Sequence, residues 1–354
     1  MKKKSKAKKI VKITLFSVLG VLVAAIAAAA FILYGRIATM ASVKYVGSDL
    51  YTMNFQQDYH LDKALDTNIK SESDLLKFIC DDMFFDYQVD ANLEKYACSA
   101  FVTKTPDGKY LGGRSFGLGG TDTLCVYTHP SDGYASISTV STDMLNVGAD
   151  NAYPTTSLEG RAALLAAPYI AVDGLNEKGL FTALLDLSMG ETHMETGNRD
   201  LTVTMAVRLL IDRAATVDEA IELLRNYDIH TGHGWTQHLF VGDASGDGAV
   251  IEWHKGQMKV VKSPICTNFR LSSKLAQDDP TGMCERFDIL HDTLEKHPEN
   301  SPSDAMDMLE AVKQEYDNNI HTEWSIVYHL TDFSMDISVD MDFDNVYHLE
   351  IKDF

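Results

Sequence analysis

The chain has 354 residues, 45% of them hydrophobic, and a formal net charge of −20. This length is enough for one large domain or two modest ones. Seven lysines among the first twelve residues mask part of the acidity, so residues 13–354 carry a net charge of −27. Nucleic acids and anionic lipids need neutralising lysine and arginine side chains, so this acidic surface argues against both as partners.

The amino-terminal segment predicts a membrane anchor. A basic head at residues 1–12 precedes an uncharged apolar run of 22 residues, from Ile13 to Tyr34. About 20 apolar residues span a bilayer as a helix, and the excess of lysine before the run predicts a cytoplasmic amino terminus. A cleaved signal peptide is the alternative, but the run is longer than the roughly 7–15 apolar residues of a signal peptide. We therefore expect a single-pass cell-membrane protein whose remaining chain is extracellular.

The segment that follows the apolar run, residues 35–97, combines a linker with a helical region. Gly35 to about Gly47 is predicted to be a short linker. A helical pattern follows at Ser71–Ile79, where Ser71 and Asp74 suit a helix start because a capping hydroxyl and an acidic side chain both favour the positive end of the helix dipole.

From Cys98 onward the pattern changes to short strands and hairpins. Asp107-Gly108 lies between two strand-like runs and is a strong hairpin signal, and Ala135–Val140 is another short strand. Two further strands flank the turn Asp243–Gly248, which imitates the start of a calcium loop. The glutamate that such a loop needs at its twelfth position is His254 here, so we interpret this turn as a hairpin.

The second half of the chain predicts helices and then a final strand. Thr202–Ala215 has apolar residues at helical spacing, and Thr216–Glu219 is a capping box for a helix through Leu224. Another helix begins at Ser301-Pro302. Alternation of apolar and polar residues over Met335–Asp344 predicts a half-buried strand of ten residues. Strands, then helices, then strands again suggest two sheets with helices packed outside them.

The cysteines are five in number and scattered, which is unlike a disulfide framework, although a single bridge stays open. We interpret them as buried thiols plus one reactive thiol. The reactive candidate is Cys98, because Arg114 follows it sixteen positions later and Asn268 lies further on. These could supply an electrostatic partner and an oxyanion donor, and no histidine occurs where a papain-type pair would need one. The five thiols are Cys80, Cys98, Cys125, Cys266 and Cys284.

Four motifs in this order resemble the choloylglycine hydrolase and penicillin V acylase family of N-terminal nucleophile amidases. The resemblance covers Cys98 to about Leu330. It implies a four-layer αββα sandwich of the α+β class at residues 98–354, with residues 35–97 as linker and pro-segment, and hydrolysis of a linear non-peptide amide without a cofactor. The motifs are Cys98 with Gly113-Arg114, Asp173–Leu180, Thr267-Asn268 and Glu323–Tyr328.

The resemblance also implies a role for each site residue. The Ala97–Cys98 bond would be cut by autoproteolysis, because the family uses the free α-amine of the cysteine as its base; such an amine titrates near pH 8. Arg114 would favour the Cys98 thiolate, and Asn268 would stabilise the tetrahedral oxyanion. Arg286, within Glu285–Phe287, would orient the nucleophile or the substrate's polar group. Asp173–Leu180 is expected to be a structural hairpin.

Two departures from the family pattern leave other functions open. Gly117 stands where the family has an aspartate that holds the nucleophile's amine, and Asp122 is the candidate substitute. Asp186 stands where relatives have a polar residue of the oxyanion hole, and a carboxylate there would repel an anion unless protonated or turned away. One alternative is therefore a catalytically impaired cell-surface binding module of the same fold. The other is transfer of the acyl group to an amine.

A metal site is not expected from the histidine pattern. His230, His233 and His238 are close in sequence, but their spacing fits no compact zinc site, and no acidic or cysteine ligand falls at a customary interval. We therefore expect the three histidines to lie in an ordinary loop.

Overall fold

The computed structural model describes residues 2–83, 97–118, 120, 122–149, 151–187, 190–232, 236–315 and 321–354. Within these ranges, only the backbone is described for residues 2–13, 15, 28–29, 31–32, 97 and 118.

Two large β-sheets form the body of the molecule. In the described part of the chain, the first sheet has nine strands and is called sheet A below. Most neighbouring strands in it are antiparallel, but β2 and β5 are parallel. Its strands, in spatial order, are β1 (Lys44–Gly47), β2 (Leu50–Phe55), β5 (Thr123–Thr128), β6 (Ser136–Ser141), β7 (Asp173–Asn176), β8 (Phe181–Asp186), β11 (Gln237–Gly242), β12 (Gly248–His254) and β13 (Gln257–Lys262).

The second large sheet, sheet B, has six antiparallel strands among the described residues. The two sheets pack face to face, and the rings of Phe181 in sheet A and Tyr328 in sheet B lie 5.0 Å apart between them. A separate pair, β9 (Arg199–Thr202) and β10 (Tyr227–His230), is parallel. The strands of sheet B, in spatial order, are β14 (Ile265–Thr267), β3 (Ala97–Lys104), β4 (Tyr110–Leu118), β15 (His321–His329), β16 (Ser334–Val339) and β17 (Tyr347–Leu349).

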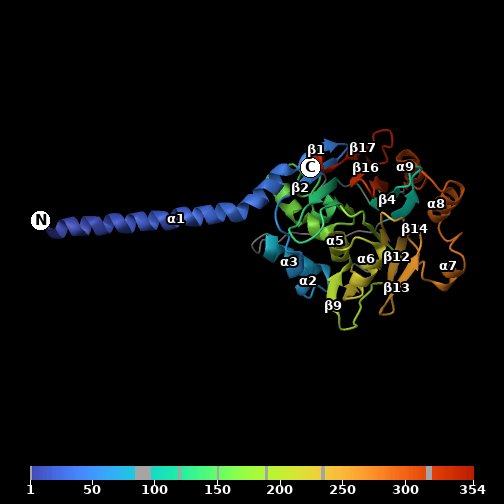
Figure 1. Cartoon of the computed structure of the whole chain (residues 1–354), viewed down its shortest axis with the longest axis horizontal. Helices are drawn as coiled ribbons and strands as arrows, with labels where there is room; N and C mark the ends of the chain where they lie inside the picture. Colours follow the sequence, from blue (N-terminus) through green and yellow to red (C-terminus); the bar gives the residue numbers. More distant parts are fainter. Residues whose placement is uncertain are drawn as a thin grey trace.

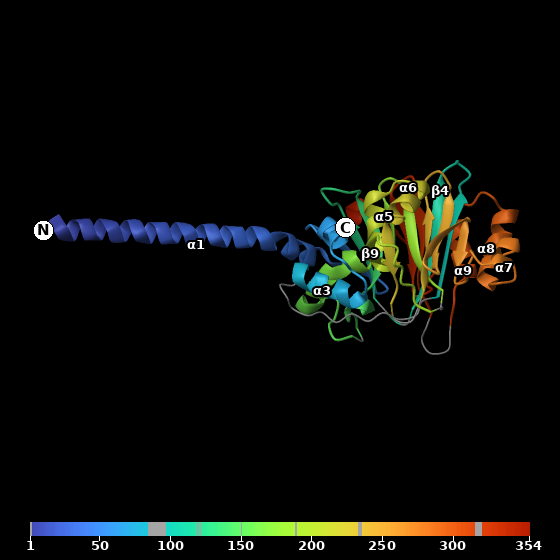
Figure 2. The same cartoon turned by 90° about the horizontal axis from the view of Figure 1, so that it is seen from below.

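Helices cover the outer faces of both sheets, and Figure 2 shows them on opposite sides. Helices α5 (Val203–Arg213) and α6 (Val217–Leu224) pack on sheet A, whereas α8 (Glu285–Lys296) and α9 (Pro302–Ala311) pack on sheet B. The predicted α+β class and the αββα order of layers are therefore what the structure has. The other helices are α1 (Lys2–Ser42), α2 (Leu61–Asp66), α3 (Glu72–Met83), α4 (Leu158–Ala163) and α7 (Lys274–Asp278), with 3-10 turns η1 (Thr142–Leu145), η2 (Leu164–Ile170) and η3 (Ile351–Asp353).

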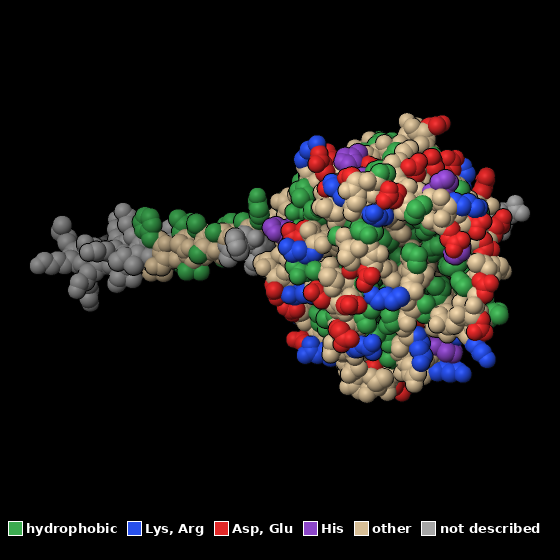
Figure 3. Space-filling model, turned by 45° about the vertical axis from the view of Figure 1, so that its right-hand side comes forward, with side chains coloured by type: hydrophobic (Ala, Val, Ile, Leu, Met, Phe, Trp, Pro, Cys, Tyr) green, Lys and Arg blue, Asp and Glu red, His purple; other side chains and the backbone are tan. Residues whose placement is uncertain are grey.

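Helix α1 projects from the body of the molecule (Figure 1), and large apolar side chains such as Phe16 and Val21 are exposed along it (Figure 3). Among the described residues, no helix combines the length and the apolar character that crossing a membrane requires. The predicted transmembrane segment at residues 13–34 is therefore not supported by the structure. Six of its side chains, those of residues 13, 15, 28, 29, 31 and 32, lie outside the described part.

The predicted linker at Gly35–Gly47 is wrong. Helix α1 continues to Ser42, and β1 begins at Lys44. Its last turns pack against β2 and η2, and the Thr39 hydroxyl accepts a hydrogen bond from the backbone of Gln56. Strand β2 then pairs with β5 along its whole length. The segment before Cys98 thus contributes two strands to sheet A rather than tethering a separate domain.

The predicted ten-residue strand at Met335–Asp344 is too long. Strand β16 ends at Val339, because Asp340 and Met341 adopt positive φ angles of 54° and 57°. Inside the strand Met335, Ile337 and Val339 are buried as predicted, but Ser334 and Ser338 are buried too, so of its polar residues only Asp336 is partly exposed. Beyond it the chain turns to bring β17 back against β16.

Local signals predicted several elements correctly. The Asp107-Gly108 turn joins β3 to β4, with Gly108 at a φ of 86° that favours glycine. Thr216 accepts from the backbone of Glu219 at the start of α6, and Ser301 forms a capping box at the start of α9. Helices α3 and α5 and strand β6 also fall within the predicted ranges to within a few residues.

Candidate active site

Cys98 is the second residue of β3, a strand between β14 and β4 in sheet B. Its side chain has no exposed surface. Cys98 is joined to Ala97 in the same strand, so its nitrogen is a peptide nitrogen, and it donates a hydrogen bond to Oδ1 of Asn268 at 2.8 Å. The candidate nucleophile is therefore buried, and its backbone nitrogen is hydrogen-bonded to Asn268.

Asn268 reaches Cys98 because of the strand register. Thr267, the last residue of β14, is opposite Ser99, so the next residue of the chain lies beside Cys98. Nδ2 of Asn268 donates to the backbone carbonyl of Asp186 at the end of β8. One amide side chain thus connects the nucleophile in sheet B to sheet A.

Arg286 approaches the same point from the first turn of α8. Its guanidinium donates to the carbonyl oxygen of Cys98, to Oγ of Ser99 at 3.0 Å, and to Oδ1 of Asn268 at 2.8 Å. The structure therefore brings together three of the predicted residues, Cys98, Asn268 and Arg286, within one hydrogen-bond network.

Arg114 lies on the same face of sheet B as Cys98. The register pairs it with Ala100, two residues along β3, and its side chain is completely buried. Nε donates to Asp173 at 3.0 Å and Nη2 to the carbonyl of Leu184 at 2.8 Å. Burial alone would lower the pKa of the guanidinium, but the neighbouring Cys98 thiol and the Asp173 carboxylate raise it above its ordinary value. A permanent cation therefore lies beside the Cys98 sulfur.

Asp173 is a buried partner of Arg114 that the sequence did not single out. Its carboxylate is fully buried and accepts hydrogen bonds from Arg114, from Nε1 of Trp324 at 3.2 Å and from the Tyr328 hydroxyl at 2.6 Å. Burial and then the charge of Asp173 raise the pKa of the Tyr328 hydroxyl well above its ordinary value. Two motifs that looked independent in the sequence, Asp173–Leu180 and Glu323–Tyr328, thus meet at this carboxylate. Their joint occurrence was the signal that could have identified it.

A second buried cluster lies beside the nucleophile and was also missed. Nε2 of His238 in β11 is 3.5 Å from the Cys266 sulfur, and its Nδ1 is 3.2 Å from Glu252 in β12. Glu252 accepts from the backbone nitrogens of Leu271 at 2.8 Å and Ser272 at 3.0 Å. Burial, and then the charge of Glu252, raises the pKa of the Cys266 thiol well above its ordinary value, which favours the neutral thiol over the thiolate. The cluster thus contacts the chain both before Asn268, at Cys266, and after it, at Leu271 and Ser272.

The structure also places Asp122, the candidate substitute for the missing aspartate, and Asp186, the departure at the oxyanion-hole position. Asp122 precedes β5, where it accepts a hydrogen bond from Thr155, and burial raises the pKa of its carboxyl group. Asp186 is buried, and its backbone carbonyl, rather than its carboxylate, accepts from Asn268. Gly117 in β4 is directly opposite Ala97. A side chain at position 117 would therefore lie beside the bond that precedes Cys98.

The histidines and remaining cysteines take structural positions. His230 lies in β10 and contacts Asp200 at 2.8 Å, so it belongs to a different sheet from His238. His233 lies outside the described residues. All five cysteines are free thiols; four are buried and Cys284 is half-buried.

Comparison with known proteins agrees with this geometry. Residues 98–269 match the family described as linear amide C-N hydrolases, choloylglycine hydrolase family. No curated protein matches the chain.

Solved structures with a similar fold come from the same group. Two are variants of conjugated bile acid hydrolase from Clostridium perfringens, a cysteine-to-alanine variant (TM-score 0.54, 16% identity) and an arginine-to-leucine variant (TM-score 0.51, 15% identity). Each similarity covers 73% of this chain and 93% of the other. Penicillin V acylase from Agrobacterium tumefaciens matches with a TM-score of 0.50 and 19% identity, over 72% of this chain and 86% of that one. Residues 98–269 therefore match the choloylglycine hydrolase family of linear amide C-N hydrolases, which confirms the predicted resemblance and supports the prediction of an amide-hydrolysing enzyme.

Proposed function

We propose that the chain hydrolyses linear, non-peptide amide C–N bonds with Cys98 as an N-terminal nucleophile, after the Ala97–Cys98 bond has been cut. The observation that carries the proposal is the convergence of Arg114, Asn268 and Arg286 on Cys98 from three different strands or helices. The match to the amidase family also begins at Cys98. The fold neighbours are named for conjugated bile acids and penicillin V, which supports amides of this kind as the substrate class.

The first step is maturation. Water is added across the Ala97–Cys98 peptide bond, which leaves a carboxylate on Ala97 and a free amine on Cys98. The Cys98 side chain is fully buried. Arg286 already donates to the Cys98 carbonyl and Asn268 already accepts from the Cys98 nitrogen. Both contacts can hold the new amino-terminal residue in place after the cut.

In the second step the new amine takes the proton of the Cys98 thiol, and the thiolate attacks the amide carbonyl of the substrate. An α-amine titrates near pH 8, so a useful fraction is neutral at pH 7. Arg114 stabilises the thiolate through its charge. Nδ2 of Asn268 carries two hydrogens, so it can serve both the Asp186 carbonyl and the developing oxyanion.

The tetrahedral intermediate then breaks at its C–N bond. The ammonium of Cys98 gives its proton to the leaving amine, and the acyl group stays on sulfur as a thioester. The same amine next takes a proton from water, whose oxygen attacks the thioester and releases a carboxylic acid. An acyl acceptor amine in place of water would give the alternative transferase reaction.

The mature amino terminus tests the proposal directly. Purified protein should separate under denaturing conditions into two chains, and amino-terminal sequencing of the larger one should begin at Cys98. Intact-mass measurement checks the same cut through the two fragment masses. A protein that turns over penicillin V or a conjugated bile acid while its Ala97–Cys98 bond is intact would contradict the mechanism.

A carboxylate at position 117 should change the pH dependence. Gly117→Asp would place an anion beside the Cys98 amine, because Gly117 is opposite Ala97. The anion favours the ammonium form and so raises the pKa of the amine. Since the neutral amine is the base, the acidic limb of kcat/KM should move to higher pH by about one unit.

The matched control for this effect is Gly117→Asn, because asparagine has the size of aspartate without its charge. In this variant the acidic limb of the kcat/KM profile should stay at its wild-type pH. A pH profile that is identical in Gly117→Asp, Gly117→Asn and wild type would show that the α-amine is not the base.

A non-catalytic binding protein of the same fold is the second candidate, and the observation that favours it is Gly117, because the family aspartate that holds the amine is missing there. Such a protein would stay uncut and would retain ligands without releasing products. The extracellular location and the membrane attachment remain predictions from the amino-terminal sequence alone.

A further inference from the structure

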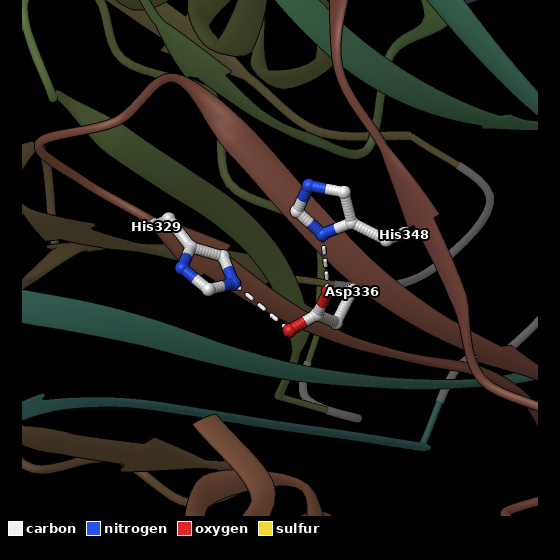
Figure 4. Close-up of side chains that lie close together, drawn as sticks. All are labelled: His329, Asp336 and His348. Atoms are coloured by element: carbon white, nitrogen blue, oxygen red, sulfur yellow. Dashed lines mark hydrogen bonds and ion pairs between the residues drawn. The ribbon is translucent and has the colours of Figure 1, made fainter. Parts of the chain in front are cut away.

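A group of three potential metal ligands lies on sheet B, and Figure 4 shows it. His329 is the last residue of β15, Asp336 is in β16 and His348 is in β17. Nε2 of His329 is 2.8 Å from Oδ2 of Asp336, and Nδ1 of His348 is 2.6 Å from its Oδ1. The two imidazoles thus contact different oxygens of the same carboxylate, and their ring centroids are 5.9 Å apart.

The sheet fixes the positions of these three residues. Asp336 is directly opposite His348 in β17 and directly opposite Val327 in β15. His329 is two residues beyond Val327, so it points to the same face, since side chains alternate along a strand. The three side chains are therefore carried by neighbouring strands that are hydrogen-bonded to one another, rather than by loops.

We propose that Nε2 of His329, the carboxylate of Asp336 and Nδ1 of His348 bind one divalent transition-metal ion, for which zinc is the best match. The three ligand atoms lie within 4.8 Å of one another. Zinc takes nitrogen and oxygen ligands at about 2.0–2.2 Å, so small side-chain rotations bring all three into coordination. Two imidazoles favour zinc over magnesium and calcium, which prefer oxygen alone.

The site is accessible and separate from Cys98. The side chains are 16% exposed for His329, 20% for Asp336 and 53% for His348, so an ion can enter from solvent and keep water as its fourth ligand. The register Val327–Gly113 and Gly113–Phe101 places Asp336 on the face of sheet B opposite to Arg114 and Cys98. The ion would therefore link the last three strands of the sheet without touching the nucleophile.

Zinc titration of the full chain, first stripped of metal with a chelator, tests this site. Isothermal titration calorimetry at pH 7.5 should show one equivalent of zinc bound. His348→Ala and Asp336→Asn should each weaken that affinity at least tenfold, because either change removes one of three ligands. His348 is half-exposed, so its replacement should leave the fold intact, and far-UV circular dichroism checks this.

The matched control is His60→Ala. His60 also contacts a carboxylate, Asp82, at 2.8 Å, but Lys63 occupies the other oxygen of that carboxylate. This variant should bind zinc like the wild type. Zinc binding that is equally strong in wild type, His348→Ala and Asp336→Asn would overturn the proposal.

Two further measurements separate this site from binding by a thiol. Cobalt bound by nitrogen and oxygen should give only weak visible bands, whereas a thiolate ligand adds strong near-ultraviolet absorption, which would count against the site. Zinc should also raise the melting temperature of the wild type, since it binds the folded state, and the rise should disappear in His348→Ala. An equal rise in both proteins would contradict the proposal.

Discussion

Replacing Cys98 with alanine should leave the chain uncut and reduce amide turnover below detection. In the proposed mechanism the sulfur is the atom that attacks the carbonyl, both in the maturation step and in the reaction with substrate. Cys98→Ala removes it without changing the hydrogen bond that the Cys98 nitrogen donates to Asn268 or the one that the Cys98 carbonyl accepts from Arg286. Intact-mass measurement reports the cut, and release of acid from penicillin V or a conjugated bile acid reports the turnover.

The matched control is Cys284→Ser, because Cys284 is a free, half-buried thiol that precedes α8. That variant should be cut and should turn over substrate like the wild type. Turnover that survives in Cys98→Ala would remove Cys98 from the mechanism, whichever substrate is used. Loss of the cut in both variants would point to a general folding effect instead.

Replacing Arg114 with methionine should have two separate effects. The first is on stability: Asp173 would be left as a buried carboxylate without its cation, which typically costs about 3–5 kcal/mol of unfolding free energy. The second is on chemistry, because the cation beside the Cys98 sulfur disappears and the thiolate loses its stabilisation. Urea denaturation measures the first effect, and turnover per folded molecule measures the second.

A second buried arginine pair separates these effects. Arg208 and Asp212 in α5 are as buried as Arg114 and Asp173, and Nε of Arg208 donates to Asp212 at 3.0 Å. Arg208→Met should therefore cost a similar amount of stability but leave the cut and the turnover of the folded fraction unchanged. If Arg208→Met lowers turnover per folded molecule as strongly as Arg114→Met does, the role of Arg114 is structural.

The elements that the sequence predicted well are those that local chemistry determines. A glycine at positive φ in the β3–β4 turn, and hydroxyl caps before α6 and α9, act within four residues and leave a clear pattern. The predictions failed where contacts between segments distant in the sequence determine the secondary structure. Gly35 to Ser42 stays helical because it packs on β2 and η2, and β2 is a strand because β5 lies beside it.

In the candidate site, too, the residues related by a local pattern could be predicted, and those brought together from distant segments could not. The sixteen-residue spacing from Cys98 to Arg114 corresponds to one hairpin, so two adjacent strands bring them together. Asp173 could not be found in this way, because its three donors come from β4 and β15 in the opposite sheet. The same holds for His238, which reaches Cys266 across the interface between the sheets, and for Glu252, which contacts His238.

The parallel pairing of Leu50–Phe55 with Thr123–Thr128 has a consequence for the processed molecule. A cut before Cys98 would break the covalent link between the two fragments. The upstream fragment would still be held in the sheet of the larger one by main-chain hydrogen bonds. The two pieces should then elute as a single particle on a sizing column and part only in denaturant. The segment before Cys98 would then stay with the mature protein as a small subunit instead of being discarded.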